Sequence, residues 1–105
     1  MSFQIYQSTT RPKLEVQVLD ADGNACNLTG CSLALYVGKV GDAAARIVTA
    51  APMNVPTPMD GLAEYAFTAV QTATAGQYDA QIEITWADAS KSRTVPILVE
   101  ILEVV

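Results

Sequence analysis

The sequence contains no histidine and only two cysteines, and this scarcity excludes several kinds of site. Nucleophilic arrangements of the Ser/His or Cys/His type need an imidazole base. A zinc site built on Cys26 and Cys31 would need further ligands that no histidine can supply. The two thiols are expected to be free and reduced, with a disulfide as the alternative. The six glycines are spread singly, so no phosphate-binding loop is present either. We expect no enzyme activity, no metal and no cofactor.

Positive charge is also scarce, because six Lys and Arg residues stand against eleven Asp and Glu, for a net charge of -5. Binding to a nucleic-acid backbone needs clustered cations, and so does attachment to an anionic membrane surface. The most apolar stretch, 95–105, is too short to cross a bilayer and carries Glu100 and Glu103. The opening residues, MSFQIYQSTTRP, lack the pattern of a secretory signal. We expect no nucleic-acid partner, no membrane partner and no secretion.

The sequence is rich in apolar residues, which make up 50% of its 105 positions, whereas charged residues make up 16%. This length and composition predict a single domain over residues 1–105 with one hydrophobic core. A lightly charged surface is typical of a protein that is partly covered by neighbours.

Alternation of apolar and polar residues indicates strands throughout the chain. The clearest case is 77–86, where Tyr78, Ala80, Ile82, Ile84 and Trp86 share one face and the polar residues share the other. No segment shows a sustained helical period. The segments with strand signatures are 3–7, 13–20, 31–40, 46–50, 62–68, 77–86 and 92–105.

Turn residues separate these segments at short intervals. Asp22-Gly23 predicts a tight hairpin turn, because glycine tolerates a positive φ. The alternative of a calcium loop over 20–31 is disfavoured, since Ala25 stands where the loop needs glycine and Cys31 where it needs glutamate. Residues 51–61 contain three prolines and are expected to form the only long irregular loop. The pattern predicts an all-β fold, an antiparallel β-sandwich of about seven strands, and the position of Tyr78 at the start of a strand favours the immunoglobulin-like type.

Four residues are expected to be structural: Gly23, Gly76, Tyr78 and Trp86. Tyr78 opens its strand just after Ala75-Gly76, as in a tyrosine corner, in which the hydroxyl bonds back to the upstream backbone. An ordinary core tyrosine with its hydroxyl at the solvent is the alternative. Trp86 is expected to cap the core rather than to form a platform for a ligand.

The last strand is apolar on both faces, with Val95, Ile97, Val99 and Ile101 on one face and the remaining apolar residues on the other. A strand with one face in water should alternate, so we expect the outer face to contact a partner. The predicted contact surface combines this strand with the proline-rich loop and consists of Pro56, Met59, Leu98, Leu102 and Val104.

Two stretches resemble a family of tailed-bacteriophage proteins. They are IYQSTTRPKLEVQVLDADGNACNLTGCSLALYV (5–37) and TATAGQYDAQIEITWADAS (72–90). The first is similar to the family's T-R-P bend, D-A-D-G turn and L-T-G turn, and the second to its A-G-x-Y strand entry. The family is the immunoglobulin-like module at the amino end of phage baseplate upper proteins, also found in short virion proteins. Cys31 and Ser90 depart from its usual Ala and Gly.

The resemblance implies a non-enzymatic structural component of a tailed-phage virion, assembled in the cytoplasm of the host bacterium. Its expected role is to dock onto other virion proteins, as an adaptor in the tail or baseplate, or onto further copies of itself in a symmetric assembly. One alternative is a capsid decoration protein associated with the head. Another is a module that binds carbohydrate or the host surface through the outward-facing Tyr6 and Tyr36.

Overall fold

The computed structural model describes residues 2–94 and 96–104, with the side chains of Ser2, Ala43 and Ala44 left out. The fold is all-β, as expected, and its only helical piece among these residues is a short 3-10 turn, η1. The elements are β1 (Ser2–Tyr6), β2 (Leu14–Gln17), β3 (Ser32–Lys39), β4 (Asp42–Pro52), β5 (Asn54–Thr57), η1 (Pro58–Asp60), β6 (Leu62–Tyr65), β7 (Gly76–Thr85), β8 (Lys91–Arg93) and β9 (Ile97–Leu102).

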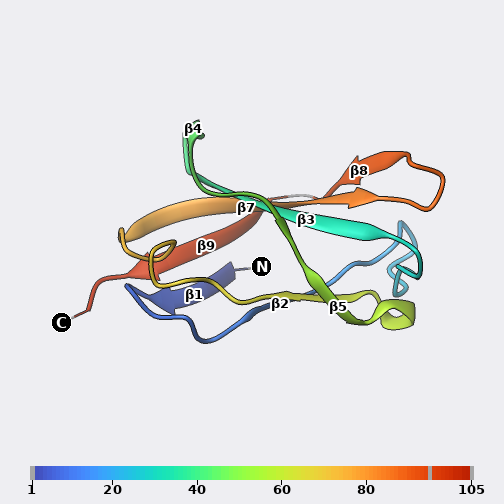
Figure 1. Cartoon of the computed structure of the whole chain (residues 1–105), viewed down its shortest axis with the longest axis horizontal. Helices are drawn as coiled ribbons and strands as arrows, with labels where there is room; N and C mark the ends of the chain where they lie inside the picture. Colours follow the sequence, from blue (N-terminus) through green and yellow to red (C-terminus); the bar gives the residue numbers. More distant parts are fainter. Residues whose placement is uncertain (1, 95, 105) are drawn as a thin grey trace.

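The strands form two sheets that lie face to face (Figure 1). The larger sheet has the strand order β1-β9-β7-β3-β4, and β8 pairs with β7 beside this path. The smaller sheet has the order β2-β6-β5. All pairs are antiparallel except β1 and β9, which run parallel. The expectation of a purely antiparallel sandwich is therefore wrong at β1, which local sequence could not indicate because the orientation of β1 depends on a strand far away in the chain.

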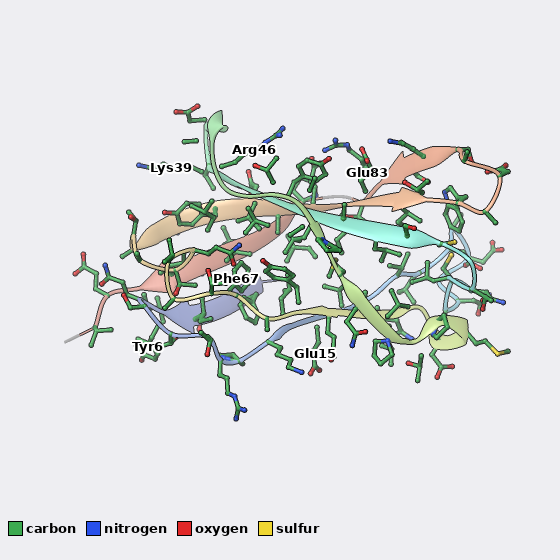
Figure 2. All side chains as sticks on the ribbon, viewed as in Figure 1. Tyr6, Glu15, Lys39, Arg46, Phe67 and Glu83 are labelled. Atoms are coloured by element: carbon green, nitrogen blue, oxygen red, sulfur yellow. The ribbon has the colours of Figure 1, made fainter. Side chains whose placement is uncertain are left out.

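A single core lies between the sheets, and strand alternation explains which residues fill it. Tyr78, Ala80, Ile82 and Ile84 of β7 are all buried, as the pattern of 77–86 predicts. Figure 2 shows Phe67 between the two layers, whereas Glu15, Lys39 and Glu83 project outward. Full burial of one large aliphatic side chain is worth ~1.5–3 kcal/mol, so this alternation fixes the register of the central strand. The buried apolar residues are Ile5, Leu14, Val16, Leu28, Leu33, Leu35, Val37, Val48, Met53, Ala63, Phe67, Tyr78, Ala80, Ile82, Ile84, Ile97, Val99 and Ile101.

The segment 51–61 is not the irregular loop that its prolines suggest. β4 continues to Pro52, and after Met53 the chain crosses to the smaller sheet as β5, which contains Pro56. Met53 is buried and its N–H donates to Leu33 O at 3.0 Å. Because β5 is the edge of its sheet, Pro56 can lack an N–H without losing an interior ladder bond. This crossing closes one side of the sandwich (Figure 1).

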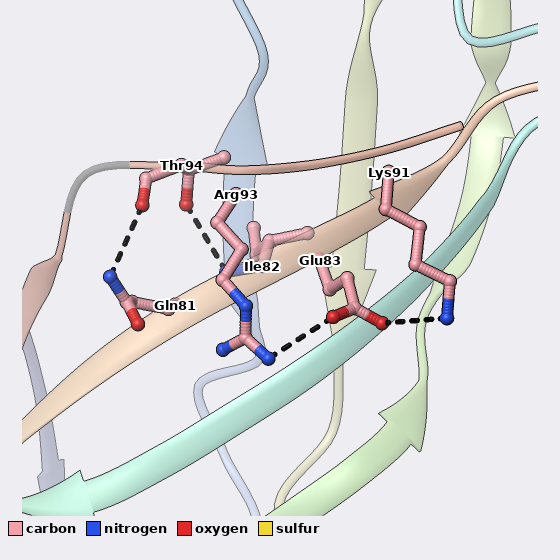
Figure 3. A network of polar contacts seen from close by, with 6 residues as sticks. All are labelled: Gln81, Ile82, Glu83, Lys91, Arg93 and Thr94. Carbon is pink, nitrogen blue, oxygen red and sulfur yellow. Dashed lines mark hydrogen bonds and ion pairs between the residues drawn. The ribbon is translucent and has the colours of Figure 1, made fainter.

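The expected last strand is also divided, into β8 and β9. From Glu83 to Ala80, β7 advances by three residues, whereas its partner advances by four, from Arg93 to Ile97. The partner therefore carries one extra residue here, as in a β-bulge. The Thr94 N–H donates to Ile82 O at 3.0 Å. Figure 3 shows the second bond, in which the Ile82 N–H donates to Thr94 Oγ1 at 3.1 Å. Val95, expected on the buried face, lies outside the described residues. Together β5 and this division raise the strand count from about seven to nine among the described residues.

The turn at 20–24 has the predicted positive φ of 83° at Gly23. The Asp20 N–H donates to Asn24 O at 2.8 Å, and an isolated bridge joins Leu19 to Ala25. Asp20 Oδ1 accepts from the N–H groups of Asp22 and Asn24. β2 nevertheless ends at Gln17, which makes it shorter than the predicted strand 13–20.

Residues 66–75 connect the two sheets through turns without a helix. Thr72 anchors this connection because its side chain is fully buried and its hydroxyl donates to Thr9 O at 2.8 Å. Tyr78 anchors it a second time, since its hydroxyl donates to Thr74 O at 3.0 Å. That bond to the upstream backbone is the one expected for Tyr78, and it satisfies a hydroxyl on a side chain that is only 3% exposed.

Candidate functional site

The predicted contact residues do not form one surface. Pro56 is exposed in β5 of the smaller sheet, and Met59 is 73% exposed in η1, which connects β5 to β6. Leu98 and Leu102 are half-buried in β9 of the larger sheet, and Val104 is exposed just beyond it. Figure 1 shows the turn beside β5 and the carboxyl end of the chain at opposite ends of the long axis. The two groups are therefore separate.

The two faces of β9 differ in burial, since one is buried and the other is half-buried. β9 lies between β1 and β7, so it is an interior strand and not an exposed edge. Its inward residues Ile97, Val99 and Ile101 belong to the core. Leu98 and Leu102, on the other face, lie beside the register partners Ser2 and Tyr6 of β1.

A different apolar surface is present on the open side of the sandwich. It is a groove of about 610 Å³ between β2 of the smaller sheet and β8 of the larger one, which we call the β2–β8 groove. Leu19 lies there with 53% of its surface exposed. The groove is lined by Val16, Gln17, Val18, Leu19, Asp20, Cys26, Ile82, Ile84, Trp86, Ser92, Arg93, Thr94, Pro96 and Ile97.

The groove exists because both flanking strands are edges. β2 pairs only with β6, and β8 pairs only with β7, among the described residues. β1 does not close this side, because its pairing with β9 begins at Ser2–Leu98 and runs away from Ile97. The groove therefore has apolar side chains below and unpaired strand edges on both sides.

Trp86 and Cys26 contribute to this groove. Trp86 is half-buried, packs against the core and donates its indole N–H to Ser92 Oγ. Trp86 therefore packs against the core, as expected, and also lines the groove. Cys26 is a half-buried free thiol, as is Cys31, in agreement with the preferred interpretation of the two cysteines.

A second concavity, of about 360 Å³, lies over the outer face of the larger sheet. The guanidinium carbons of Arg46 and Arg93 lie 5.1 and 4.6 Å from the ring centroid of Tyr36. Arg93 Nη2 also lies 3.1 Å from Glu83 Oε2, and Lys91 Nζ lies 3.7 Å from Glu83 Oε1 (Figure 3). Exposed pairs of this kind contribute roughly 0–1 kcal/mol each, so the cluster orders side chains more than it stabilises the fold.

The two aromatic residues proposed for carbohydrate binding have different surroundings. Two guanidinium groups already lie over the Tyr36 ring, so a sugar would have to displace one of them to stack there. Tyr6 is 56% exposed on β1. One exposed aromatic side chain is common on protein surfaces and does not by itself define a sugar site.

Acid–base chemistry is sparse in the described residues. No group of three or more Cys, Asp or Glu side chains in them could hold a metal ion. The one resolved pKa shift is at the exposed Asp88, where hydrogen bonds from the Ser90 hydroxyl and N–H hold the pKa of the carboxyl below its usual value. This pair belongs to the turn between β7 and β8, so the shift reflects turn geometry.

Two further findings concern membrane-spanning helices and similarity to known proteins. Residues 2–94 and 96–104 contain no helix with the length and apolarity needed to cross a bilayer. No protein-family model matches the chain, and no curated protein matches it significantly.

Sequence reasoning missed the residues that form the groove. Val18 and Leu19 follow β2 directly, whereas Pro96 lies between β8 and β9, so these residues come from two distant places in the chain that meet only in the fold. The one local signal was Leu19 itself, which breaks the alternation of 13–20 by following Val18 directly. Gly61 was also missed, although its position after a proline-containing turn is typical of a left-handed residue.

Proposed function

We propose that the chain is a non-enzymatic, immunoglobulin-like component of a tailed-phage virion that docks onto other virion proteins, as an adaptor in the tail or baseplate. The observation that carries the docking role is the β2–β8 groove, an apolar concavity between two unpaired strand edges. Edges of this kind are normally covered or blunted in a protein that acts alone. The phage assignment itself comes from the resemblance of residues 5–37 and 72–90.

The strand order supports the immunoglobulin-like assignment. If β3, β7 and β9 correspond to strands C, F and G, then the larger sheet holds these three side by side, as that fold requires. If β2, β6 and β5 correspond to B, E and D, the smaller sheet follows the same scheme. Tyr78 then stands at the start of strand F, where a tyrosine corner belongs, and its hydroxyl bonds to Thr74 O.

The docking role is favoured over the carbohydrate-binding alternative. The groove offers an apolar floor and open main-chain groups, which suit a protein partner. The Tyr36 ring is already covered by guanidinium groups, which weakens the case for sugar stacking.

The test is to purify assembled particles from the phage whose genome encodes the chain and to identify their proteins by mass spectrometry. The chain should be present in fixed copy number, and a cryo-EM map should place its density in the tail or baseplate. Density on the capsid surface would instead favour the head-decoration alternative. Absence from particles, or specific binding of the purified domain on a glycan array, would overturn the proposal.

A further inference from the structure

The open edge of β2 has a definite arrangement of hydrogen-bonding groups. The Val18 N–H donates to Gly61 O at 2.8 Å, in register with the pairing of β2 and β6. Successive residues of a strand direct their N–H and C=O groups to opposite edges. Glu15 and Gln17 therefore direct theirs away from β6, to the side where no described strand lies.

This edge borders the apolar floor of the groove. Val16 and Val18 from the smaller sheet face Ile82, Ile84 and Ile97 from the larger one, and all five line the concavity. An occupant would thus meet main-chain donors and acceptors at its side and apolar side chains beneath it. A strand presents both features together, because its backbone supplies the ladder and every second side chain points to one face.

β1 does not pair with the open edge of β2. β1 begins its pairing with β9 at Ser2–Leu98, while Ile97 and Pro96 line the groove. Figure 1 shows the amino end of β1 near the middle of the long axis, directed toward the half that contains β8. Among the described residues, no strand lies beside the open edge of β2, and an added strand of about seven residues would be ~23 Å long.

The negative charge on the β2 side of the groove restricts the charge that a partner strand can carry. Glu15 is exposed on β2, and Asp20 lines the groove, so the outward residues of an added strand would face carboxylates. Like charges directly opposite one another destabilise a strand pair, whereas opposite charges stabilise it. Arg93 on the far wall is already paired with Glu83.

We propose that an extended segment of a partner protein, apolar at every second residue and basic or neutral at the others, adds to the open edge of β2 and fills the β2–β8 groove. This inference rests on the docking role proposed above and specifies the chemistry of the partner. The added strand hydrogen-bonds with Glu15 and Gln17 and buries its apolar side chains against the groove floor.

The experiment uses a capped peptide of about seven residues in which valine alternates with lysine and threonine. It is added to the full chain in solution, and it is also fused before the chain through a short glycine–serine linker, which gives an effective concentration in the millimolar range. The readouts are fluorescence of Trp86, which is the only tryptophan and lines the groove, and hydrogen exchange of the Glu15 and Gln17 amides. The fusion should protect both amides and raise the melting temperature by about 4 °C or more.

The matched variants are Gln17→Pro and Gln17→Thr. Both remove the side-chain bond from Gln17 Nε2 to Asp60 O, but only the proline removes the outward N–H. Peptide affinity should fall at least about tenfold in Q17P and stay close to the parent value in Q17T. A peptide methylated at alternate amides should bind equally poorly to the unaltered chain, so the test does not depend on Q17P folding.

Two results would overturn the inference. One is a fusion that leaves the Glu15 and Gln17 amides unprotected. The other is a change in Trp86 fluorescence when a small apolar dye binds, together with failure of the peptide to displace that dye. This result would indicate that the groove binds small molecules instead of a strand. The two proposals can fail separately. If the chain is found in virions but binds no added strand, the docking role stands and this inference fails. If the chain binds an added strand but is absent from virions, this inference stands and the docking role fails.

Discussion

The hydroxyl of Tyr78 shows how much depends on a single polar atom. It is part-buried and donates to Thr74 O, so it ties the connection between the sheets to the central strand. Tyr78→Phe should destabilise the fold by about 1–2 kcal/mol, because the carbonyl loses its partner while the ring still packs. Urea denaturation followed by Trp86 fluorescence measures the change. The control is Tyr6→Phe on the exposed β1, which should stay within about 0.5 kcal/mol, and equal losses in both variants would contradict the anchoring role.

Gly61 and Gly23 allow the cost of a strained backbone conformation to be distinguished from the cost of a steric clash. Both have positive φ, 69° and 83°. A Cβ at Gly61 would lie 2.6 Å from Val18 O and 2.8 Å from Cys26 O, whereas one at Gly23 would meet nothing within 4 Å. Gly23→Ala should therefore cost about 1 kcal/mol, and Gly61→Ala at least about 2 kcal/mol more. Thermal unfolding of the two variants side by side checks this, and similar melting temperatures would show that the backbone at Gly61 shifts freely.

At the level of elements, the junction between β8 and β9 depends on a threonine side chain. Thr94 Oγ1 accepts from the Ile82 N–H at the point where the strand carries its extra residue. Thr94→Val keeps the shape but removes this acceptor, so it should cost about 1–3 kcal/mol and increase hydrogen exchange at Ile82. Thr94→Ser retains the oxygen and is the matched control. Equal exchange at Ile82 in both variants would contradict the role of the hydroxyl.

The sequence predicted the interior strands better than the edges. β3 and β7 follow strict alternation, and Leu33, Leu35, Ile82 and Ile84 are buried as expected. β5 was missed because Pro56 disfavours an interior strand but is tolerated at an edge. The division of the last strand was missed because a hydroxyl replaces a main-chain acceptor at Thr94. Local patterns thus reveal which residues face the core, but not where a strand stops.

At the scale of the whole molecule, the candidate site could not be predicted from the sequence. The groove depends on which strands are edges, and that follows from pairings such as Ser2–Leu98, which join distant parts of the chain. The apolar character of 97–102 and the prolines of 51–61 suggested one shared contact surface, but β9 and β5 belong to different sheets. Hydrophobic periodicity carries no information about the order of strands in a sheet, so the open side becomes visible only in three dimensions.

The placement of the groove leads to a prediction about assembly. Leu19 and Met59 are both more than half exposed, but Leu19 lines the β2–β8 groove whereas Met59 lies in η1. Leu19→Asp places a carboxylate where the proposed partner strand buries its apolar side chains, which is strongly unfavourable. Incorporation of L19D into particles should fall at least about tenfold.

Met59→Asp is the control because it adds the same charge on a residue outside the groove. It should assemble at the parent level, and both variants should fold with stabilities within about 0.5 kcal/mol of the parent. Quantitative mass spectrometry of purified particles, complemented in trans with each variant, gives the ratio directly. If L19D and M59D are incorporated equally, the partner binds elsewhere on the molecule, since no docked protein could cover the groove and leave a new buried carboxylate without effect.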